Sequence, residues 1–300
     1  MSEAVQYKEL TKRFRGVVAV DGLNLTVPEG AVYALVGVNG AGKTTAIKTL
    51  MNILRPSSGS AEVLGTDSRR ISPRELQQIG YVSENQEMPE WMTVKYFLKY
   101  LKPFYPQWDD ALAEELVREF DLPVDRRLRN LSRGMKMKAA LASSLAYRPK
   151  LIVLDEPFSG LDPLVRDEFI KSLLERATGA TVLISSHDLA EIESFASHIG
   201  YLDRGRLEFS EELSGLAARF REIEVIMDAP PVLPAAWPPG WIRPESSAAV
   251  VRFIDSRFDR ERSLEEVRKL FPGARNVSVT AMPLREIFIA VAKTRRAAAW

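Results

Sequence analysis

The stretch ALVGVNGAGKTT, residues 34–45, decides the fold class. From Gly37 to Thr44 it fits the pattern G-x-x-x-x-G-K-[ST] at every fixed position. An apolar run precedes this pattern and a helical stretch, 45–52, follows it. Backbone amides of such a glycine-rich turn converge on phosphate oxygens, and glycine lets the main chain approach them closely. The pattern therefore predicts a nucleotide-phosphate site formed by Gly37, Val38, Asn39, Gly40, Ala41, Gly42, Lys43, Thr44 and Thr45.

Charged and hydroxyl side chains in two segments suit the hydrolysis of a bound triphosphate. Lys43 should neutralise charge on the β- and γ-phosphates, and the Thr44 hydroxyl should bind Mg²⁺. The apolar run LIVLDEP, 151–157, ends in two acids, Asp155 and Glu156. Because burying charge is costly, such an ending indicates either acids exposed to solvent at the end of a strand or acids that serve a catalytic or metal site. In a site, Asp155 would hold Mg²⁺ through water and Glu156 would polarise the attacking water.

A second apolar run, ATVLISSH, ends in His187. That histidine could donate a hydrogen bond to the γ-phosphate, or it could be an ordinary loop histidine. A helix over residues 164–178 lies between the two apolar runs. The order strand, helix, strand predicts a parallel sheet and an α/β fold.

The bulk composition is that of a globular protein. The 300 residues are 46% hydrophobic and 27% charged, enough for a substantial core. The net charge of +1 provides no strong field to attract nucleic acid. With no cysteine, the chain has no disulfide and no thiolate metal site. The N-terminus is too charged for a signal peptide and no 18 apolar residues are consecutive, so we expect a membrane role only through a partner.

Changes of character along the chain predict two domains. Residues 1–211 form a nucleotide-binding cassette with an inserted helical subdomain at about 84–150. Residues 212–300 form a small accessory α/β domain that could regulate the cassette, help it dimerise or cover its core. Within it, the Pro-rich stretch 229–244 is expected to be a loop.

One longer stretch points to a particular family. The segment LSRGMKMKAALASSLAYRPKLIVLDEPFSGLDP, 131–163, resembles the ATP-binding subunit of ATP-binding cassette (ABC) transporters. The resemblance covers about 1–215 and implies a P-loop ABC-type cassette with a mixed sheet. Its motifs stand in the family order: an adenine-stacking aromatic at Phe14, the phosphate loop, the signature at 131–135, the D-loop ending at Asp162, and the switch histidine at 187.

The signature departs from the usual LSGGQ. Arg133 replaces the first glycine and Met135 replaces the glutamine, whereas Ser132 and Gly134 remain. Ser132 can still cap the following helix, whose N-terminus can face a phosphate.

The Q-loop departs as well. Glu84 stands where the family usually has glutamine, and Gln86 follows two residues later. Either residue could reach Mg²⁺, since alignment favours Glu84 and side-chain chemistry favours Gln86. A carboxylate beside Mg²⁺ is chemically acceptable.

The resemblance implies half of a dimer, a homodimer or a heterodimer with a second ABC ATPase. Two chains would sandwich ATP and Mg²⁺, with Ser132, Gly134 and Asp162 of one chain completing the site of the other. Hydrolysis would drive a separate transmembrane permease of an exporter-like system, holding the subunit on the cytoplasmic face of the cell membrane. The helical insertion would contact that permease; its apolar residues Met88, Trp91, Met92 and Tyr96 could serve this contact or the subdomain's own core.

Two other functions compete with this interpretation. A soluble ABC-type ATPase acting on ribosomes or nucleic acid usually has two cassettes or large insertions, so we expect no nucleic-acid partner. A module that only binds ATP is disfavoured by the intact Lys43, Asp155, Glu156 and His187.

Overall fold

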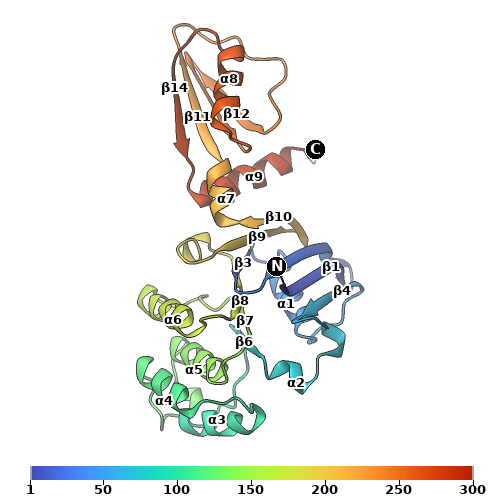
Figure 1. Cartoon of the computed structure of the whole chain (residues 1–300), viewed down its shortest axis with the longest axis vertical. Helices are drawn as coiled ribbons and strands as arrows, with labels where there is room; N and C mark the ends of the chain where they lie inside the picture. Colours follow the sequence, from blue (N-terminus) through green and yellow to red (C-terminus); the bar gives the residue numbers. More distant parts are fainter. Residues whose placement is uncertain (1, 299–300) are drawn as a thin grey trace. The chain divides into compact units, whose positions relative to one another are not determined.

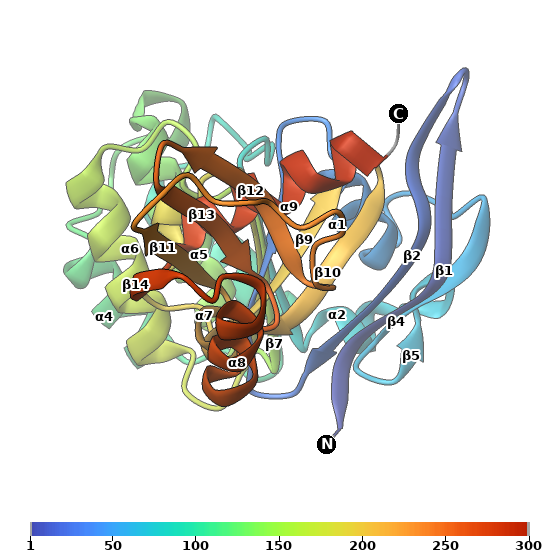
Figure 2. The same cartoon turned by 90° about the horizontal axis from the view of Figure 1, so that it is seen from above.

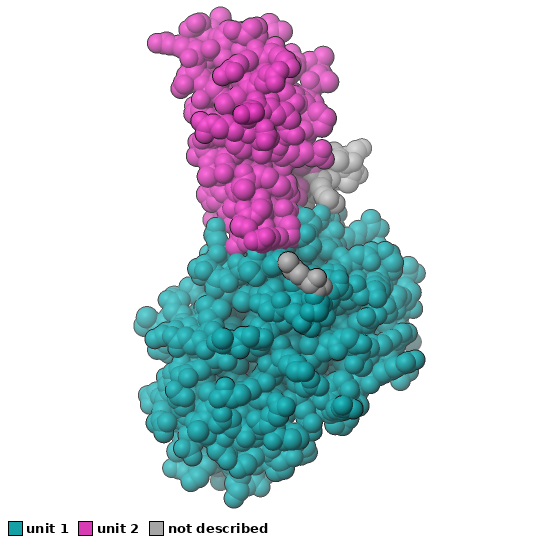
Figure 3. Space-filling view, viewed as in Figure 1, with its two compact units in different colours: residues 1–210 teal, residues 211–300 magenta. Residues whose placement is uncertain are grey.

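The computed structural model describes residues 2–298. The chain divides into two compact units, 1–210 and 211–300 (Figure 3). The first unit contains two sheets. A four-stranded sheet has the order β2-β1-β4-β5, with β1 (Glu3–Phe14), β2 (Val17–Pro28), β4 (Ser58–Val63) and β5 (Thr66–Asp67). Figure 2 shows the long β1 and β2 running together at one side of this unit.

The second sheet carries the expected parallel strands. Its order is β10-β9-β3-β8-β7-β6, with β3 (Val32–Val36), β6 (Ile79–Ser83), β7 (Leu151–Asp155), β8 (Thr181–Ser186), β9 (His198–Asp203) and β10 (Arg206–Glu212). Neighbouring pairs β3–β8, β3–β9, β6–β7 and β7–β8 are parallel. The connection from β7 to β8 runs through α6 (Pro163–Arg176), so the expected strand–helix–strand order and the α/β fold are confirmed.

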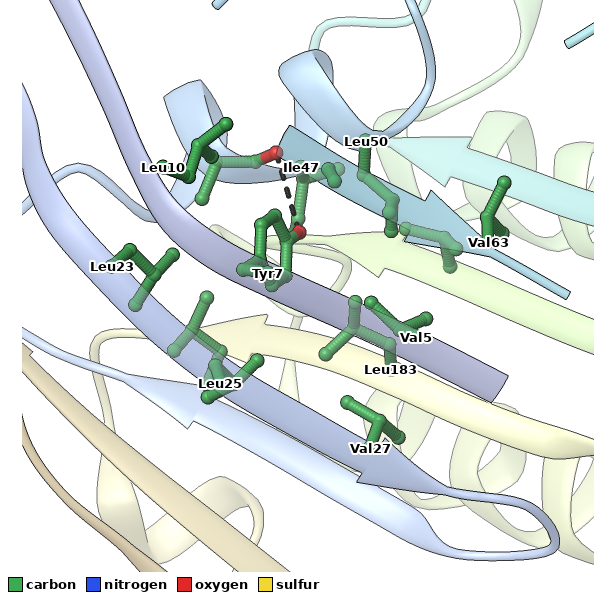
Figure 4. Packing of buried hydrophobic residues seen from close by; sticks show 14 of the residues in the cluster. Val5, Tyr7, Leu10, Leu23, Leu25, Val27, Ile47, Leu50, Val63 and Leu183 are labelled. Atoms are coloured by element: carbon green, nitrogen blue, oxygen red, sulfur yellow. Dashed lines mark hydrogen bonds between the residues drawn. The ribbon is translucent and has the colours of Figure 1, made fainter. Parts of the chain in front are cut away.

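The helix after the glycine-rich turn, α1 (Lys43–Leu50), is held in a single apolar core. That core joins buried side chains of both sheets to α1, including Leu10 of β1, Ile47 of α1 and Leu183 of β8 (Figure 4). The Tyr7 hydroxyl of β1 donates a hydrogen bond of 3.3 Å to the Ala46 carbonyl oxygen of α1. Packing on both sides fixes the position of the α1 N-terminus, where the phosphate loop ends.

Between β6 and β7 the chain is largely helical. Figure 1 shows α3 (Val94–Leu101), α4 (Asp110–Glu119) and α5 (Arg133–Leu145) grouped together. Each begins at a capping side chain, Thr93, Asp109 or Ser132, that accepts a hydrogen bond from a backbone amide of the first turn. The remaining helical segments of this unit are η1 (Ser68–Arg70), α2 (Pro73–Leu76), η2 (Lys102–Phe104), η3 (Leu128–Asn130) and η4 (Leu189–Glu191).

The second unit is built on an antiparallel sheet of order β12-β13-β11-β14. Its strands are β11 (Arg221–Met227), β12 (Trp241–Ser247), β13 (Val250–Asp255) and β14 (Ala274–Ala281), and its helices are α7 (Leu213–Arg219), α8 (Arg260–Leu270) and α9 (Leu284–Ala298). Within residues 2–298, none of the helices is both long enough and apolar enough to cross a membrane.

The expectation of a loop through 229–244 is wrong at its end, because residues 241–244 belong to β12. Trp241 is only 6% exposed and stacks on Phe253 with ring centroids 3.9 Å apart. Trp237 packs beside both rings. Burial of two large aromatic side chains offsets the poor strand propensity of the neighbouring prolines.

Candidate functional site

The candidate site lies where four parallel strands end. The glycine-rich turn follows β3, Glu84 follows β6, Glu156 follows β7 and His187 follows β8. Because the four strands are parallel and adjacent, their carboxyl ends share one edge of the sheet. Residues that are distant in the chain therefore meet at this edge.

The turn after β3 needs its glycines because backbone presses on it from other strands. A Cβ at Gly37 would lie 2.2 Å from the Leu202 carbonyl oxygen. A Cβ at Gly42 would lie 2.3 Å from the Ala19 carbonyl oxygen, and the φ of Gly42 is +110°. A residue with a side chain at either of these two positions would force the neighbouring backbone to move.

Lys43, the first residue of α1, is only 4% exposed. Its Nζ donates hydrogen bonds to the carbonyl oxygens of Gly37 at 2.6 Å and Val38 at 3.3 Å, within its own turn. It also lies 3.0 Å from Glu156 Oε1. The cation is thus directed back over the turn rather than into solvent.

Asp155 is buried at the end of β7 and accepts two hydrogen bonds on Oδ1. Thr44 Oγ1 donates one at 2.9 Å and Ser185 Oγ donates the other at 2.8 Å. Burial raises the pKa of Asp155 above its usual range, and the two hydroxyl hydrogen bonds oppose that rise. Ser185 was not predicted, although it stands opposite Asp155 in the parallel register, one residue before the end of β8.

Glu156 lies between two groups that can carry positive charge. Besides Lys43, His187 Nδ1 is 2.7 Å from Glu156 Oε2. The backbone of Glu156 has a φ of +51°, and its amide donates to Ser185 Oγ at 3.0 Å. The side chain of Glu156 thus reaches both Lys43 of the glycine-rich turn and His187 after β8. A carboxylate oriented in this way can accept a proton from water at the strand ends.

The two candidate Q-loop residues have different surroundings. Glu84 lines the same cavity as Lys43 and Thr44, and its amide donates to the Asp155 carbonyl oxygen at 3.0 Å. Gln86 lines a neighbouring hollow, and its Oε1 accepts from the Ser83 amide at 3.4 Å. The geometry favours Glu84 for contact with a ligand in the cavity.

The cavity has a volume of about 560 Å³ and an open side. Its lining consists of Ala19, Asn39, Gly40, Ala41, Gly42, Lys43, Thr44, Thr45, Glu84, Glu156, Ser159 and His187. Asp155 lies behind Thr44, and Phe14 lies half exposed at the end of β1 with the Lys12 ammonium 4.9 Å from its ring centroid. Ala19 and Ser159 were not singled out as ligand contacts in the sequence.

Six predicted nucleotide contacts do not line this cavity, namely Phe14, Gly37, Val38, Ser132, Gly134 and Asp162. The last three lie at the N-termini of two helices. Ser132 caps α5 by accepting from the Met135 amide at 3.2 Å, and Gly134 follows it in the first turn. Asp162 caps α6 by accepting from the Val165 amide at 3.1 Å. Within one chain, none of these three residues lines the cavity together with the glycine-rich turn.

A glycine-rich turn with a buried lysine, followed by acids and a histidine on adjacent parallel strands, defines the class of phosphate-loop ATPases. The family model described as "ABC transporter" matches residues 20–159. The chain belongs to the ATP-binding proteins of ABC transporters, and it is an ATPase whose hydrolysis is coupled to transport.

Two relatives and one solved structure illustrate this membership. The daunorubicin/doxorubicin resistance ATP-binding protein DrrA of Streptomyces peucetius is 31% identical, over 97% of this chain and 92% of its own length. The bacitracin transport ATP-binding protein BcrA of Enterococcus faecalis is 32% identical, over 74% of this chain and 73% of its own. A structure titled as the ATP-binding subunit of an ABC transporter superposes with a TM-score of 0.65 at 28% identity, over 72% of this chain and 92% of that one.

Proposed function

We propose that two copies of this chain, or this chain and a paralogue, close around ATP and Mg²⁺ and drive a separate transmembrane permease in export. The observation that carries the proposal is the division of the predicted nucleotide contacts. Lys43, Glu156 and His187 meet at one cavity, whereas Ser132 and Asp162 cap helices outside it. A second chain would supply the missing contacts if its α5 N-terminus faced the open side of the cavity.

Within one chain, the cavity suits the phosphates. Amides of the glycine-rich turn and the α1 N-terminus would bind phosphate oxygens, and Lys43 would exchange its carbonyl partners for them. Glu156 would orient and deprotonate the attacking water, and His187, which is hydrogen-bonded to it, would steady the γ-phosphate. Phe14 would stack on adenine, for which its exposed ring is available.

The donor set at the cavity fits Mg²⁺. The oxygens of Thr44, Asp155 and Glu84 are the hard ligands that this ion prefers. Asp155 already shares a hydrogen bond with Thr44, so it would act behind that hydroxyl, through water. The ion, when bound, neutralises charge on the β- and γ-phosphates.

The permease contact is proposed for the helical region. Of the apolar residues considered there, Met92 is 4% exposed and belongs to the core, whereas Trp91 is 63% exposed. The rings of Trp91 and Tyr96 lie 5.6 Å apart and both remain accessible. Exposed aromatic pairs of this kind are enriched at protein interfaces.

Export and location at the inner face of the cell membrane are inferred from the relatives. DrrA, named for drug resistance, aligns along nearly the whole chain, including the second unit. None of the relatives reported above favours the alternative of an ATPase that acts on ribosomes or nucleic acid.

Mixing two inactive variants tests the shared site. Lys43→Ala removes the phosphate contact of its own cavity, and Ser132→Arg blocks the contact with a partner. Each variant alone should be inactive. Their mixture should regain roughly a quarter of the wild-type rate of phosphate release, because half of the random two-fold dimers then hold one intact site. A Ser132→Arg variant with full activity by itself would refute a site shared between chains.

A further inference from the structure

The two positions at which the signature and the Q-loop depart from their usual residues lie in direct contact. The Arg133 guanidinium forms an ion pair with the Glu84 carboxylate, between Nη2 and Oε1. The two residues are 49 positions apart in the chain. Arg133 is the first residue of α5, and Glu84 lines the phosphate cavity.

Arg133 also touches the segment after β7. Ser159 Oγ donates to the same Glu84 Oε1 at 3.0 Å. A Cβ placed on Gly160, whose φ is +67°, would lie 3.3 Å from the Arg133 guanidinium carbon and Nη1. The guanidinium therefore lies next to Gly160. Through Arg133, the α5 N-terminus contacts both Glu84 and the 159–160 segment.

Charge gives this contact a consequence for nucleotide binding. A carboxylate at the cavity repels phosphate oxygens. Solvent weakens this repulsion at a partly exposed site but does not abolish it. Arg133 compensates the charge of Glu84 and also fixes its position, since a guanidinium binds carboxylates with defined geometry. Lys43 instead pairs with Glu156 and with carbonyl oxygens of its own turn.

We propose that Arg133 is a positioning residue for ATP binding at the cavity of its own chain. It holds the Glu84 carboxylate at the cavity wall and offsets its charge, so that the side chains at positions 84 and 133 function as a pair. The proposal rests on the proposed function of the cavity. It assigns to Arg133 a role in its own chain, distinct from any contact of Ser132 with a second chain.

A double-substitution cycle tests the pair through ATP affinity. The variants are Arg133→Gln, Glu84→Gln and the double variant, and the probe is a fluorescent ATP analogue titrated with and without Mg²⁺. Without Mg²⁺, Arg133→Gln should weaken binding by up to about fivefold, because the carboxylate then faces the phosphates without its cation. The double variant should bind within about twofold of wild type, since residues in contact give non-additive effects. With Mg²⁺, the loss in Arg133→Gln should shrink.

Two further variants separate charge from folding. Arg133→Lys keeps the charge and should restore most of the affinity. Lys136→Gln removes a cation from the same helix that lies 3.7 Å from Glu90, away from the cavity, and should bind as wild type does. If the losses of ATP affinity in the two single variants add up in the double variant, the proposed pairing is refuted. An equal loss of affinity in Lys136→Gln would refute it as well.

Hydrogen exchange of the nucleotide-free protein tests the same pair without any ligand. Arg133→Gln should speed exchange of amides 84–88 several-fold relative to the wild-type protein. Equal exchange in Arg133→Gln and wild type would overturn the proposal. Failure of the wild-type protein to bind ATP would instead count against the proposed function. The exchange result would then still test whether Arg133 holds Glu84 in place.

Discussion

Replacing Glu156 by Gln is the sharpest test of the hydrolytic site. The carboxylate lies 3.0 Å from Lys43 Nζ and 2.7 Å from His187 Nδ1. Glutamine keeps the shape and one oxygen acceptor for Lys43, but it cannot take a proton from water. Loss of a general base lowers turnover by about 10²–10⁴-fold, which corresponds to about 2.7–5.4 kcal/mol in the activation barrier.

ATP binding should survive the substitution. Lys43 retains the Gly37 and Val38 carbonyl oxygens, and one negative charge is removed from beside the phosphates. Binding of ATP should therefore be equal or tighter, and the ATP-bound dimer should persist because hydrolysis no longer separates it.

The assay is phosphate release at saturating Mg²⁺–ATP, combined with the molar mass in solution with and without ATP. Glu175→Gln, at an exposed glutamate of α6, is the matched control and should hydrolyse ATP as wild type does. Turnover of Glu156→Gln within about threefold of wild type would refute the base assignment. A large loss of ATP affinity would show that Glu156 instead supports the phosphate loop.

The other predictions concern stability. Asp155→Asn should raise the melting temperature near neutral pH, because it removes the free-energy cost of burying a carboxylate. Each kcal/mol removed corresponds to about 2–4 °C. The same substitution should abolish hydrolysis. Burial raises the folded-state pKa of Asp155, so the cost of its ionisation is present above that pKa and disappears as the pH falls below the unfolded value of about 3.9. The gain should therefore shrink on acidification, and a gain independent of pH between neutrality and about pH 4 would refute this account. Trp241→Ala should destabilise the second unit by about 3–5 kcal/mol, because Trp241 stacks on Phe253 in its core. Calorimetry should show a lowered transition for that unit with ATP affinity retained, and an unshifted transition would contradict the packing.

Local patterns along the chain were enough for much of the fold. The run from β3 through the glycine turn to α1 is contiguous, so its geometry follows from glycine conformation and helix periodicity in a dozen residues. The apolar runs of β7 and β8, with the helix between them, determined a parallel pair. The error at β12 came from prolines and glycines whose local preference is overridden by the burial of Trp241.

Contacts between distant segments could not be read in the same way. Ser185 meets Asp155 only because β7 and β8 pair in one particular register, which would change with a shift of one residue. The contact of Arg133 with Glu84 depends on where the packing of α5 places its N-terminus relative to the end of β6.

The amino-acid sequence by itself determined the family, the phosphate loop and the chemical types present at the site, because each lies in a short stretch with its own conformational preference. Only the tertiary structure decided which of these groups share a cavity. Lys43, Glu84, Glu156 and His187 come together there, whereas Ser132 and Asp162 remain outside. The physical reason is that strand register and helix packing, which arise from contacts across the whole core, set the distances between side chains.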